Sequence, residues 1–304
     1  MADRFDIAVI GAGMAGASLA AELGDAARVV MLEAESHPGY HATGRSAAFW
    51  TESYGGPQVQ PLTTASGPYL HDGGFLVPRG ALTLGQAGDA ARAEAFVTRF
   101  AAQGVRVELL DRAGVSARVP GLRDPWTLGV WEPDCCDIDV GRLHQHFLAR
   151  ARSAGAALYN GARLIAAERR HGAWHLALAD GRALRADLLV NAAGAWADHV
   201  AAMAGVRPLG LSPLRRTVAQ VRVSPPATDD LPLVLDLGER FYFKPESGRL
   251  WLSPHDETPS LPCDAAPEEL DVALAIARVA GVVDWRVERV EHRGAGLRTF
   301  APDR

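Results

Sequence analysis

The sequence predicts an α/β fold: a doubly wound, Rossmann-type domain and a second α+β domain built on an antiparallel sheet. Residues 5–32 contain a strand, a glycine turn, a helix and a second strand, which is the order of a βαβ unit. Residues 216–253 instead contain several strands joined by tight turns. A chain of 304 residues also exceeds the usual size of one hydrophobic core, so two domains are expected.

The N-terminal unit begins with an apolar strand, Phe5–Ile10. The composition then predicts a helix over residues 15–23, ended by Gly24, and a strand over residues 29–32. Residues 39–67 are rich in Gly, Thr and Ser without periodicity, so we expect a long loop there with at most one helical turn.

The middle of the chain predicts helices over residues 90–102 and 140–154, and then a meander of three strands over residues 164–190. Asp137 and Asp139 precede the second helix, where carboxylates commonly cap N–H groups. His144 and His146 lie on this helix two positions apart, and we expect both to be exposed to solvent.

The C-terminal third predicts strands over residues 216–223, 241–244 and 250–253, a helix over 267–280 and a strand over 286–290. The elements suggest two domains made of interleaved segments. The predicted segments are 1–80 and 138–208 for the nucleotide-binding domain, 81–137 and 209–292 for the substrate domain, and 293–304 for a truncated return to the first domain.

The composition argues against several kinds of partner. The net charge of −5 is spread along the chain without a basic stripe, so no nucleic-acid partner is expected. No apolar run approaches the roughly 20 residues of a membrane span, so we expect a cytoplasmic protein without a transmembrane segment. Three cysteines are atypical of a secreted disulfide framework, and no His and Cys spacing predicts a metal site.

A glycine-rich turn after the first strand predicts a dinucleotide site. It reads Gly11-Ala12-Gly13-Met14-Ala15-Gly16, a spacing that permits a tight turn and close approach of a pyrophosphate. Glu33, followed by Ala34, ends the next strand about twenty residues later, where a carboxylate accepts hydrogen bonds from ribose hydroxyls. The turn by itself does not distinguish NAD from FAD.

Two further segments favour FAD. Both segments come after the glycine-rich turn in the sequence. The first is residues 43–48, Thr43-Gly44-Arg45-Ser46-Ala47-Ala48, and the second is residues 190–197, which contain Ala193, Gly194 and Trp196. Their small residues allow the backbone to approach a flat, bulky ligand, and Thr43 and Ser46 offer hydroxyl donors.

These segments resemble the D-amino-acid oxidase class of flavoproteins and, within it, the D-arginine dehydrogenases. The likeness covers residues 39–46, 56–59, 190–196, 205–211 and 296–298. It implies non-covalently held FAD, with the glycine turn at the pyrophosphate, Glu33 at the adenosine ribose and the backbone near Leu164 at the adenine. The residues that the resemblance assigns to FAD are Gly11, Gly13, Met14, Ala15, Gly16, Glu33, Ala34, Thr43, Gly44, Arg45, Ser46, Ala47, Ala48, Leu164, Ala193, Gly194 and Trp196.

The resemblance also assigns a substrate site to Arg216, Arg298, Tyr242 and Tyr54. An arginine fork suits bidentate capture of a carboxylate, and capture fixes the α-carbon hydrogen relative to the flavin. Arg215 competes with Arg216 for this role. Strand alternation places Tyr242 on the face opposite its two phenylalanine neighbours.

Three positions depart from the D-arginine dehydrogenases: Phe49 replaces a histidine, Ala81 a glutamate and Gly294 a tryptophan. A pocket without the carboxylate is a poor site for a buried guanidinium, so we expect a neutral or apolar D-amino acid as substrate. The alternative is that Glu52, in the same loop as Phe49, replaces the missing carboxylate and binds a cationic side chain of the substrate.

The predicted reaction is hydride transfer from the substrate to FAD, followed by hydrolysis to a 2-oxo acid and ammonia. The alternatives are a glycine or N-methyl amino acid oxidase, and an FAD-binding module without turnover. The sequence leaves the electron acceptor, a quinone-type compound or oxygen, undecided. Family members continue past the Gly296-Leu297-Arg298 stretch for several tens of residues that this chain lacks, so it is either a fragment or a naturally short product.

Overall fold

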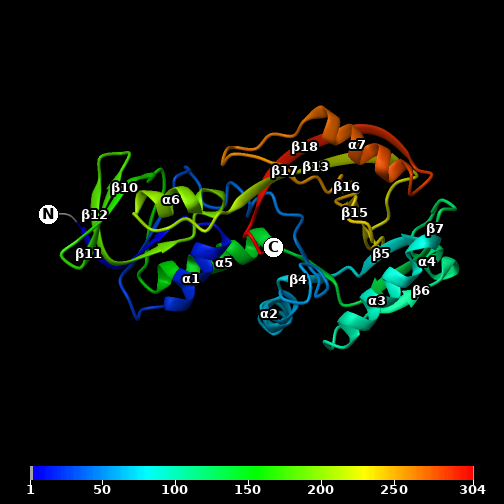
Figure 1. The fold of residues 1–304 in the computed structure, drawn as a ribbon, viewed down its shortest axis with the longest axis horizontal. Helices are drawn as coiled ribbons and strands as arrows, with labels where there is room; N and C mark the ends of the chain where they lie inside the picture. The colour runs from blue at the N-terminus through cyan, green and yellow to red at the C-terminus, as the bar shows by residue number, and fades with distance from the viewer. Residues whose placement is uncertain (1–2, 304) are drawn as a thin grey trace.

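A computed structural model describes residues 3–303, which form two large sheets with helices packed on them (Figure 1). The first sheet has the order β10-β11-β12-β1-β2-β9. Strands β12, β1, β2 and β9 run parallel, and β10, β11 and β12 form an antiparallel meander. The strands are β1 (Asp3–Ile10), β2 (Val29–Leu32), β9 (Ala157–Tyr159), β10 (Leu164–Arg170), β11 (Ala173–Leu178) and β12 (Ala183–Asn191).

Strand β1 is covered on both faces, as a parallel strand in a doubly wound domain must be. Ile7 and Val9 pack on one side with α1 (Met14–Leu23) and α5 (Val140–Ser153). Ala8 and Ile10 pack on the other side with the meander and with α6 (Ala197–Met203). The predicted βαβ unit and meander are therefore confirmed.

The second sheet is mostly antiparallel and lies beside the first (Figure 1). Its path is β17-β13-β16-β15-β14-β5-β7-β6, with β18 also paired to β13; only β5 and β14 run parallel. The strands are β5 (Ala81–Gln86), β6 (Glu108–Leu110), β7 (Trp126–Glu132), β13 (Ser212–Ser224), β14 (Leu233–Asp236), β15 (Tyr242–Glu246), β16 (Arg249–Ser253), β17 (Thr258–Pro259) and β18 (Arg286–Phe300). Helices α4 (Arg112–Arg118) and α7 (Glu269–Ala280) bury their apolar sides in its core, and α3 (Ala90–Ala101) covers a smaller cluster.

A three-stranded sheet, β3-β8-β4, joins segments from the first half of the chain. It contains β3 (Phe49–Trp50), β4 (Leu76–Pro78) and β8 (Cys136–Ile138). Between β3 and β4 lies α2 (Gln60–Asp72), a helix of 13 residues, so the prediction of a loop with at most one helical turn over residues 39–67 is wrong. Pro61 in the first turn and Pro68 inside the helix hide its signal, although Pro is well accommodated in a first turn.

The last long strand, β18, extends further than the predicted strand over residues 286–290. It pairs with β13 from Arg286 to Phe300. Residues 293–300, assigned from the sequence to the return toward the first domain, thus continue in the second sheet. The domain boundaries themselves remain predictions. No helix within residues 3–303 combines the length and apolar character needed to span a membrane.

Candidate functional site

The glycine turn between β1 and α1 brings backbone segments into close contact. Gly11 has a φ of +96°, and a Cβ atom there would lie 2.5 Å from the carbonyl oxygen of Ala192. A Cβ atom on Gly16 would lie 2.0 Å from the carbonyl oxygen of Gly11. Glycine is therefore required at both positions, and the turn stays tight against the end of β12.

The N-terminus of α1 is suited to an anion. Its N-cap residue, Gly13, has no side chain to occupy the N–H groups of the first turn, and that turn contains no acidic residue. The helix dipole and the N–H groups together favour a phosphate at this end. The turn and the helix end fit the pyrophosphate of a dinucleotide.

Glu33 is a buried carboxylate directly after β2. Its Oε2 accepts a hydrogen bond from Ala12 N at 3.1 Å, and its Oε1 accepts one from Glu35 N at 3.0 Å. Glu33 therefore holds the glycine turn, and each of its oxygens keeps a second lone pair for another donor. Its assignment to the ribose remains a prediction.

The loop over residues 43–48 links the glycine turn to β18. Thr43 Oγ1 accepts a hydrogen bond from Met14 N at 3.0 Å. Arg45 donates to the carbonyl oxygens of Ala265 and Ala295, each at 2.9 Å, and forms an ion pair with Asp264. The sequence did not predict this use of Arg45, which joins both halves of the chain.

The remaining residues predicted to contact FAD lie in several parts of the fold. Ala47 and Ala48 line the cavity described below, and Gly44 N donates to Gly39 O at 2.8 Å. Leu164 is buried at the start of β10, two residues after Ala162, whose N–H donates to Glu33 O at 2.7 Å. The ring of Trp196 lies 4.5 Å from that of His41. Ala34 follows Glu33, while Ala193 and Gly194 follow β12.

His144 is buried on α5, so the expectation that it is exposed is wrong. Its Nε2 lies 2.8 Å from the carbonyl oxygen of Ala12, and its ring fills the space where a side chain on Gly39 would lie. A buried imidazole needs a partner, and the glycine turn supplies it. His146 on the same helix is partly exposed.

Asp137 and Asp139 have different roles, although both were expected to cap α5. Asp139 is the cap and accepts from Arg142 N at 2.9 Å. Asp137 lies in β8 and binds Arg79 Nε at 2.8 Å and Lys244 Nζ at 2.7 Å. The cap prediction for Asp137 is wrong because two cations outside the helix compete for its carboxylate.

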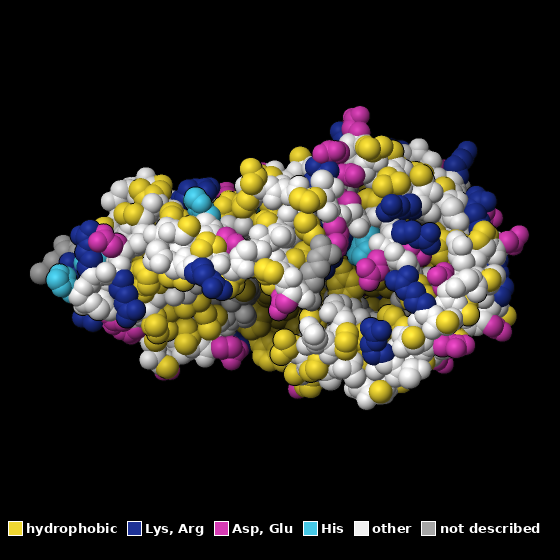
Figure 2. All heavy atoms as spheres, viewed as in Figure 1, with side chains coloured by type: hydrophobic (Ala, Val, Ile, Leu, Met, Phe, Trp, Pro, Cys, Tyr) yellow, Lys and Arg dark blue, Asp and Glu magenta, His cyan; other side chains and the backbone are white. Residues whose placement is uncertain are grey.

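A cavity of about 210 Å³ contains all four residues predicted to bind the substrate. It lies among the loop over residues 42–48, the residues around Phe49 and Tyr54, and strands β13, β15 and β18. Figure 2 shows a hollow with hydrophobic atoms on its floor near the middle of the molecule. The lining residues are Ala42, Arg45, Ser46, Ala47, Ala48, Phe49, Tyr54, Arg216, Val218, Tyr242, Gly296, Leu297 and Arg298.

Arg216 is buried and largely committed to the loop before β17. Its Nε donates to the carbonyl oxygen of Asp256 at 2.7 Å, and its Nη2 donates to Glu257 Oε1 at 3.2 Å. The Asp256 carboxylate also accepts from Thr217 N at 2.7 Å. The guanidinium is thus fixed at the cavity wall.

Arg298 has a different environment. Its guanidinium carbon lies 5.4 Å from the ring centroid of Tyr54 and 4.8 Å from that of Phe300. Its Nη1 lies 3.9 Å from Glu257 Oε1. Aromatic faces attract a cation without using its N–H donors, so this arginine keeps donors for a carboxylate ligand.

Tyr242 lies on the same wall, with its ring 6.1 Å from that of Phe49. Burial raises the pKa of the Tyr242 hydroxyl, while its hydrogen bond to Ser253 acts in the opposite direction. The ring of His255 lies 5.8 Å from that of Tyr242. Burial, reinforced by Arg216, lowers the pKa of His255 to about 4, so this imidazole is neutral at pH 7.

Arg215 does not line the cavity. It pairs with Glu268 and with Asp271, whose Oδ2 lies 2.8 Å from its Nη2, at the start of α7. Adjacent residues on a strand face opposite sides, so only Arg216 of this pair reaches the cavity. Ala81 does not line it either, and packs behind it in a cluster with Tyr242.

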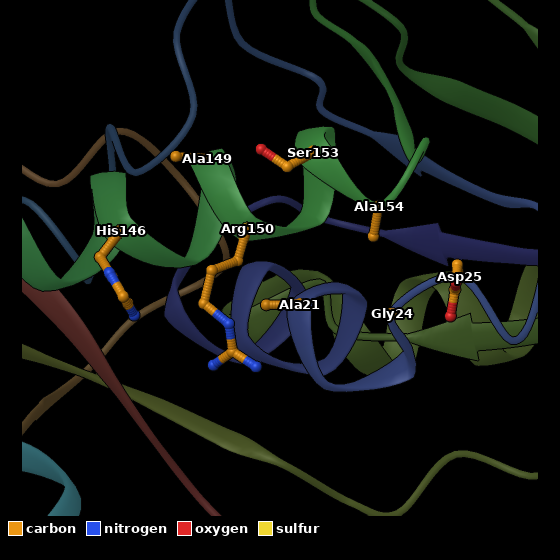
Figure 3. Close-up of a pocket in the computed structure, with 8 residues that line it drawn as sticks. All are labelled: Ala21, Gly24, Asp25, His146, Ala149, Arg150, Ser153 and Ala154. Carbon is orange, nitrogen blue, oxygen red and sulfur yellow. The ribbon is translucent and has the colours of Figure 1, made fainter.

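A larger and shallower hollow of about 560 Å³ lies between α1 and α5 (Figure 3). Ala21, Asp25, His146 and Arg150 are among its lining residues. None of the residues predicted to bind cofactor or substrate lines this hollow. We therefore place the candidate site at the smaller cavity.

Sequence reasoning missed Glu257 and His255 beside the substrate residues. Glu257 lies 41 positions from Arg216, and no local pattern links the two. The run His255-Asp256-Glu257 after β16 was the available signal, because three polar residues follow a buried strand there.

The fold has many solved counterparts. Glycine oxidase from Geobacillus kaustophilus matches with a TM-score of 0.86 at 24% identity, over 99% of this chain and 84% of that chain. L-α-Glycerophosphate oxidase from Mycoplasma pneumoniae with FAD bound matches with a TM-score of 0.90 at 12% identity, over 99% and 84%. L-amino acid deaminase from Proteus vulgaris matches with a TM-score of 0.82 at 14% identity, over 100% and 85%. At these identities the matches establish the fold.

The family comparison covers nearly the whole chain. Residues 6–304 match the family described as DAO, FAD dependent oxidoreductase. The predicted cofactor, FAD, is thereby confirmed, as is the resemblance to this class of flavoproteins, whereas particular closeness to the D-arginine dehydrogenases is not. The chain belongs to the DAO family of FAD-dependent oxidoreductases.

Proposed function

We propose that this oxidoreductase oxidises a neutral or apolar D-amino acid to the imino acid, which hydrolyses to the 2-oxo acid and ammonia. The supporting observation is a pair of arginines, Arg216 and Arg298, at a cavity whose other wall residues include Phe49, Val218 and Leu297. Arg45 also lines the cavity, but Ala265, Ala295 and Asp264 already engage its guanidinium. The other two arginines, in a partly apolar wall, suit one carboxylate attached to an apolar side chain.

The residues of the chain divide the work of binding. Arg298 offers N–H donors to the substrate carboxylate, and Arg216 adds positive charge from its fixed position. The Tyr54 and Tyr242 rings limit how the substrate can turn. FAD supplies the hydride acceptor, and the binding residues hold the α-carbon hydrogen in one direction.

The glycine turn, Glu33 and the loop over residues 43–48 would hold FAD. The loop over residues 42–48 contributes Ala42 and residues 45–48 to the cavity lining. Its Thr43 bonds to Met14 N at the glycine turn, so the loop connects the cofactor segment with the substrate segment. This connection supports a substrate site next to the FAD.

The test is an anaerobic screen of the purified protein with D- and L-leucine, D- and L-phenylalanine, glycine, sarcosine and L-proline. Loss of the oxidised flavin absorbance reports substrate oxidation. We expect bleaching by the D-enantiomers of leucine and phenylalanine and little by their L-enantiomers. Faster bleaching by glycine or sarcosine would instead support a glycine or N-methyl amino acid oxidase, and no bleaching by any compound would support a module without turnover.

A further inference from the structure

Glu132, at the end of β7, is a buried carboxylate outside the cavity lining. Its position on the second sheet is fixed by pairing with Ala81 of β5. Its side chain, however, bonds to the segment that follows β3. A buried carboxylate is costly unless donors surround it, so its partners identify what it stabilises.

Three consecutive residues of that segment donate to Glu132. Thr51 Oγ1 donates to Oε2 at 2.7 Å, and Ser53 Oγ donates to the same oxygen. Glu52 N donates to Oε1 at 2.7 Å. Hydrogen bonds to a charged acceptor are among the stronger ones, so the three together fix this short segment on the sheet.

The next residue is Tyr54, which lines the cavity. Its N–H donates to Thr51 O at 3.4 Å, so the held segment turns directly into Tyr54. Gly55 and Gly56 follow with φ values of +86° and +81°. Since glycines give little restraint on the C-terminal side, the fixed position of Tyr54 depends on the side held by Glu132.

Tyr54 in turn contacts the groups assigned to the substrate. Its ring lies 5.2 Å from that of Phe49 and lies under the guanidinium of Arg298 at 5.4 Å. A displaced segment would remove one aromatic face from Arg298 and open the cavity to water.

We propose that Glu132 is a positioning residue, which holds the segment Thr51–Ser53 so that Tyr54 and Arg298 are preorganised for the substrate carboxylate. The proposal rests on the proposed function, because it assigns Tyr54 and Arg298 to substrate binding. It adds a residue that touches neither substrate nor cofactor and acts through the segment alone.

The experiment compares Glu132→Gln with the unchanged protein, both loaded with FAD. Chymotrypsin cleavage after Tyr54, followed by mass spectrometry, reports release of the segment without any substrate. Turnover of D-leucine with an artificial dye acceptor gives KM and kcat. We expect cleavage to be faster and KM to rise, each by about tenfold, with a smaller change in kcat.

Two further variants keep the result interpretable. Asp236→Asn removes another buried carboxylate of the same sheet, bound to Arg240 instead of the segment, and should change neither cleavage nor KM. If Glu132→Gln does not fold, the double variant Thr51→Val and Ser53→Ala removes donors from the segment side and should reproduce both effects.

Unchanged cleavage in Glu132→Gln would overturn the proposal. So would faster cleavage with an unchanged KM, provided that Tyr54→Leu, which removes the aromatic ring, raises KM. If Tyr54→Leu and Arg298→Lys both leave KM unchanged, the substrate role of the cavity residues fails, and the positioning role falls with it. A failure of the proposed function is therefore distinguished from a failure of the Glu132 contact.

Discussion

The carboxylate of Glu257 lies 3.2 Å from Nη2 of Arg216, the arginine whose guanidinium is fixed at the cavity wall. The same oxygen lies 3.9 Å from Nη1 of Arg298. One acid therefore faces both arginines and offsets part of the positive charge that a substrate carboxylate would meet. The side chain of Glu257 is partly exposed, so solvent screens this effect.

Glu257→Gln should strengthen the binding of a substrate carboxylate. Removing the negative charge leaves both arginines to attract the ligand, and we expect KM for a neutral amino acid to fall about threefold with little change in kcat. Steady-state kinetics at low ionic strength measure the effect. Glu268→Gln is the control because Glu268 pairs with Arg215 outside the cavity. A rise in KM would show that Glu257 supports the arginines more than it competes for them.

Arg298→Lys should weaken transition-state binding because an ammonium does not reproduce a two-pronged bond to a carboxylate. We expect kcat/KM to fall by an amount equivalent to roughly 2 to 4 kcal/mol. Arg293→Lys is the control, since Arg293 lies on the same strand and its side chain is largely exposed. An unchanged kcat/KM in Arg298→Lys would remove Arg298 from the substrate site.

Gly11→Ala should lower the FAD content of the purified protein. The new Cβ atom would meet the Ala192 carbonyl at 2.5 Å and push the glycine turn away from β12. Gly155 has a φ of +89°, close to the +96° of Gly11, but a Cβ atom there meets no atom within 4 Å. Gly155→Ala therefore imposes similar backbone strain without the clash, and it should retain FAD. Flavin released on denaturation measures both; equal flavin content would contradict the close-approach interpretation.

The sequence predicts those parts of the site that depend on local pattern. Gly11 and Gly16 reveal the turn because a tight backbone approach excludes every other residue, and the strand order places Glu33 beside it. Tyr242 faces the cavity because alternation along β15 is a local property.

Contacts between distant segments were beyond such reasoning. His144 looks like an exposed helix residue until the fold brings the carbonyl of Ala12 against it. Asp137 has the local context of a cap, yet Arg79, which follows β4, and Lys244 of β15 form ion pairs with it. Glu257 and Glu132 likewise gain their roles only from tertiary packing.

His255 should make the protein less stable as the pH falls from about 6.5 to about 4. Its pKa is lowered from 6.5 to about 4 in the folded protein, so the unfolded chain takes up the proton first. Between these values the unfolded state binds more protons, and stability present above pH 6.5 is lost, by up to about 3 kcal/mol in total.

Urea unfolding at several pH values measures this loss. His255→Asn should reduce the slope between pH 6.5 and 4, and asparagine tolerates the φ of +55° found at this position. Burial raises the pKa values of Glu132 and Asp256, which would give the opposite slope, so only the difference between the two proteins is diagnostic. Identical slopes would show that His255 does not stay neutral in the folded protein.

The choice of substrate side chain depends on the apolar part of the cavity. Phe49 lies on its wall, and Ala81 is buried behind it. Each methylene that a substrate buries here gains about 0.8 kcal/mol. A cationic side chain would lose water without gaining a free carboxylate, because Glu132 is occupied by three donors, Glu52 accepts from Thr64 and Glu257 accepts from Arg216.

We therefore expect kcat/KM to be higher for D-leucine and D-phenylalanine than for D-arginine. Phe49→Glu adds a carboxylate to the wall itself and should raise kcat/KM for D-arginine relative to that for D-leucine. Phe49→Gln, in which the new side chain has the size of glutamate but no charge, should not. The wall position is preferable to Ala81→Glu, because a carboxylate at residue 81 would be buried in an apolar cluster and would destabilise the fold. If D-arginine is the best substrate of the unchanged protein, the apolar-pocket interpretation is wrong, while the assignment to the FAD-dependent family is unaffected.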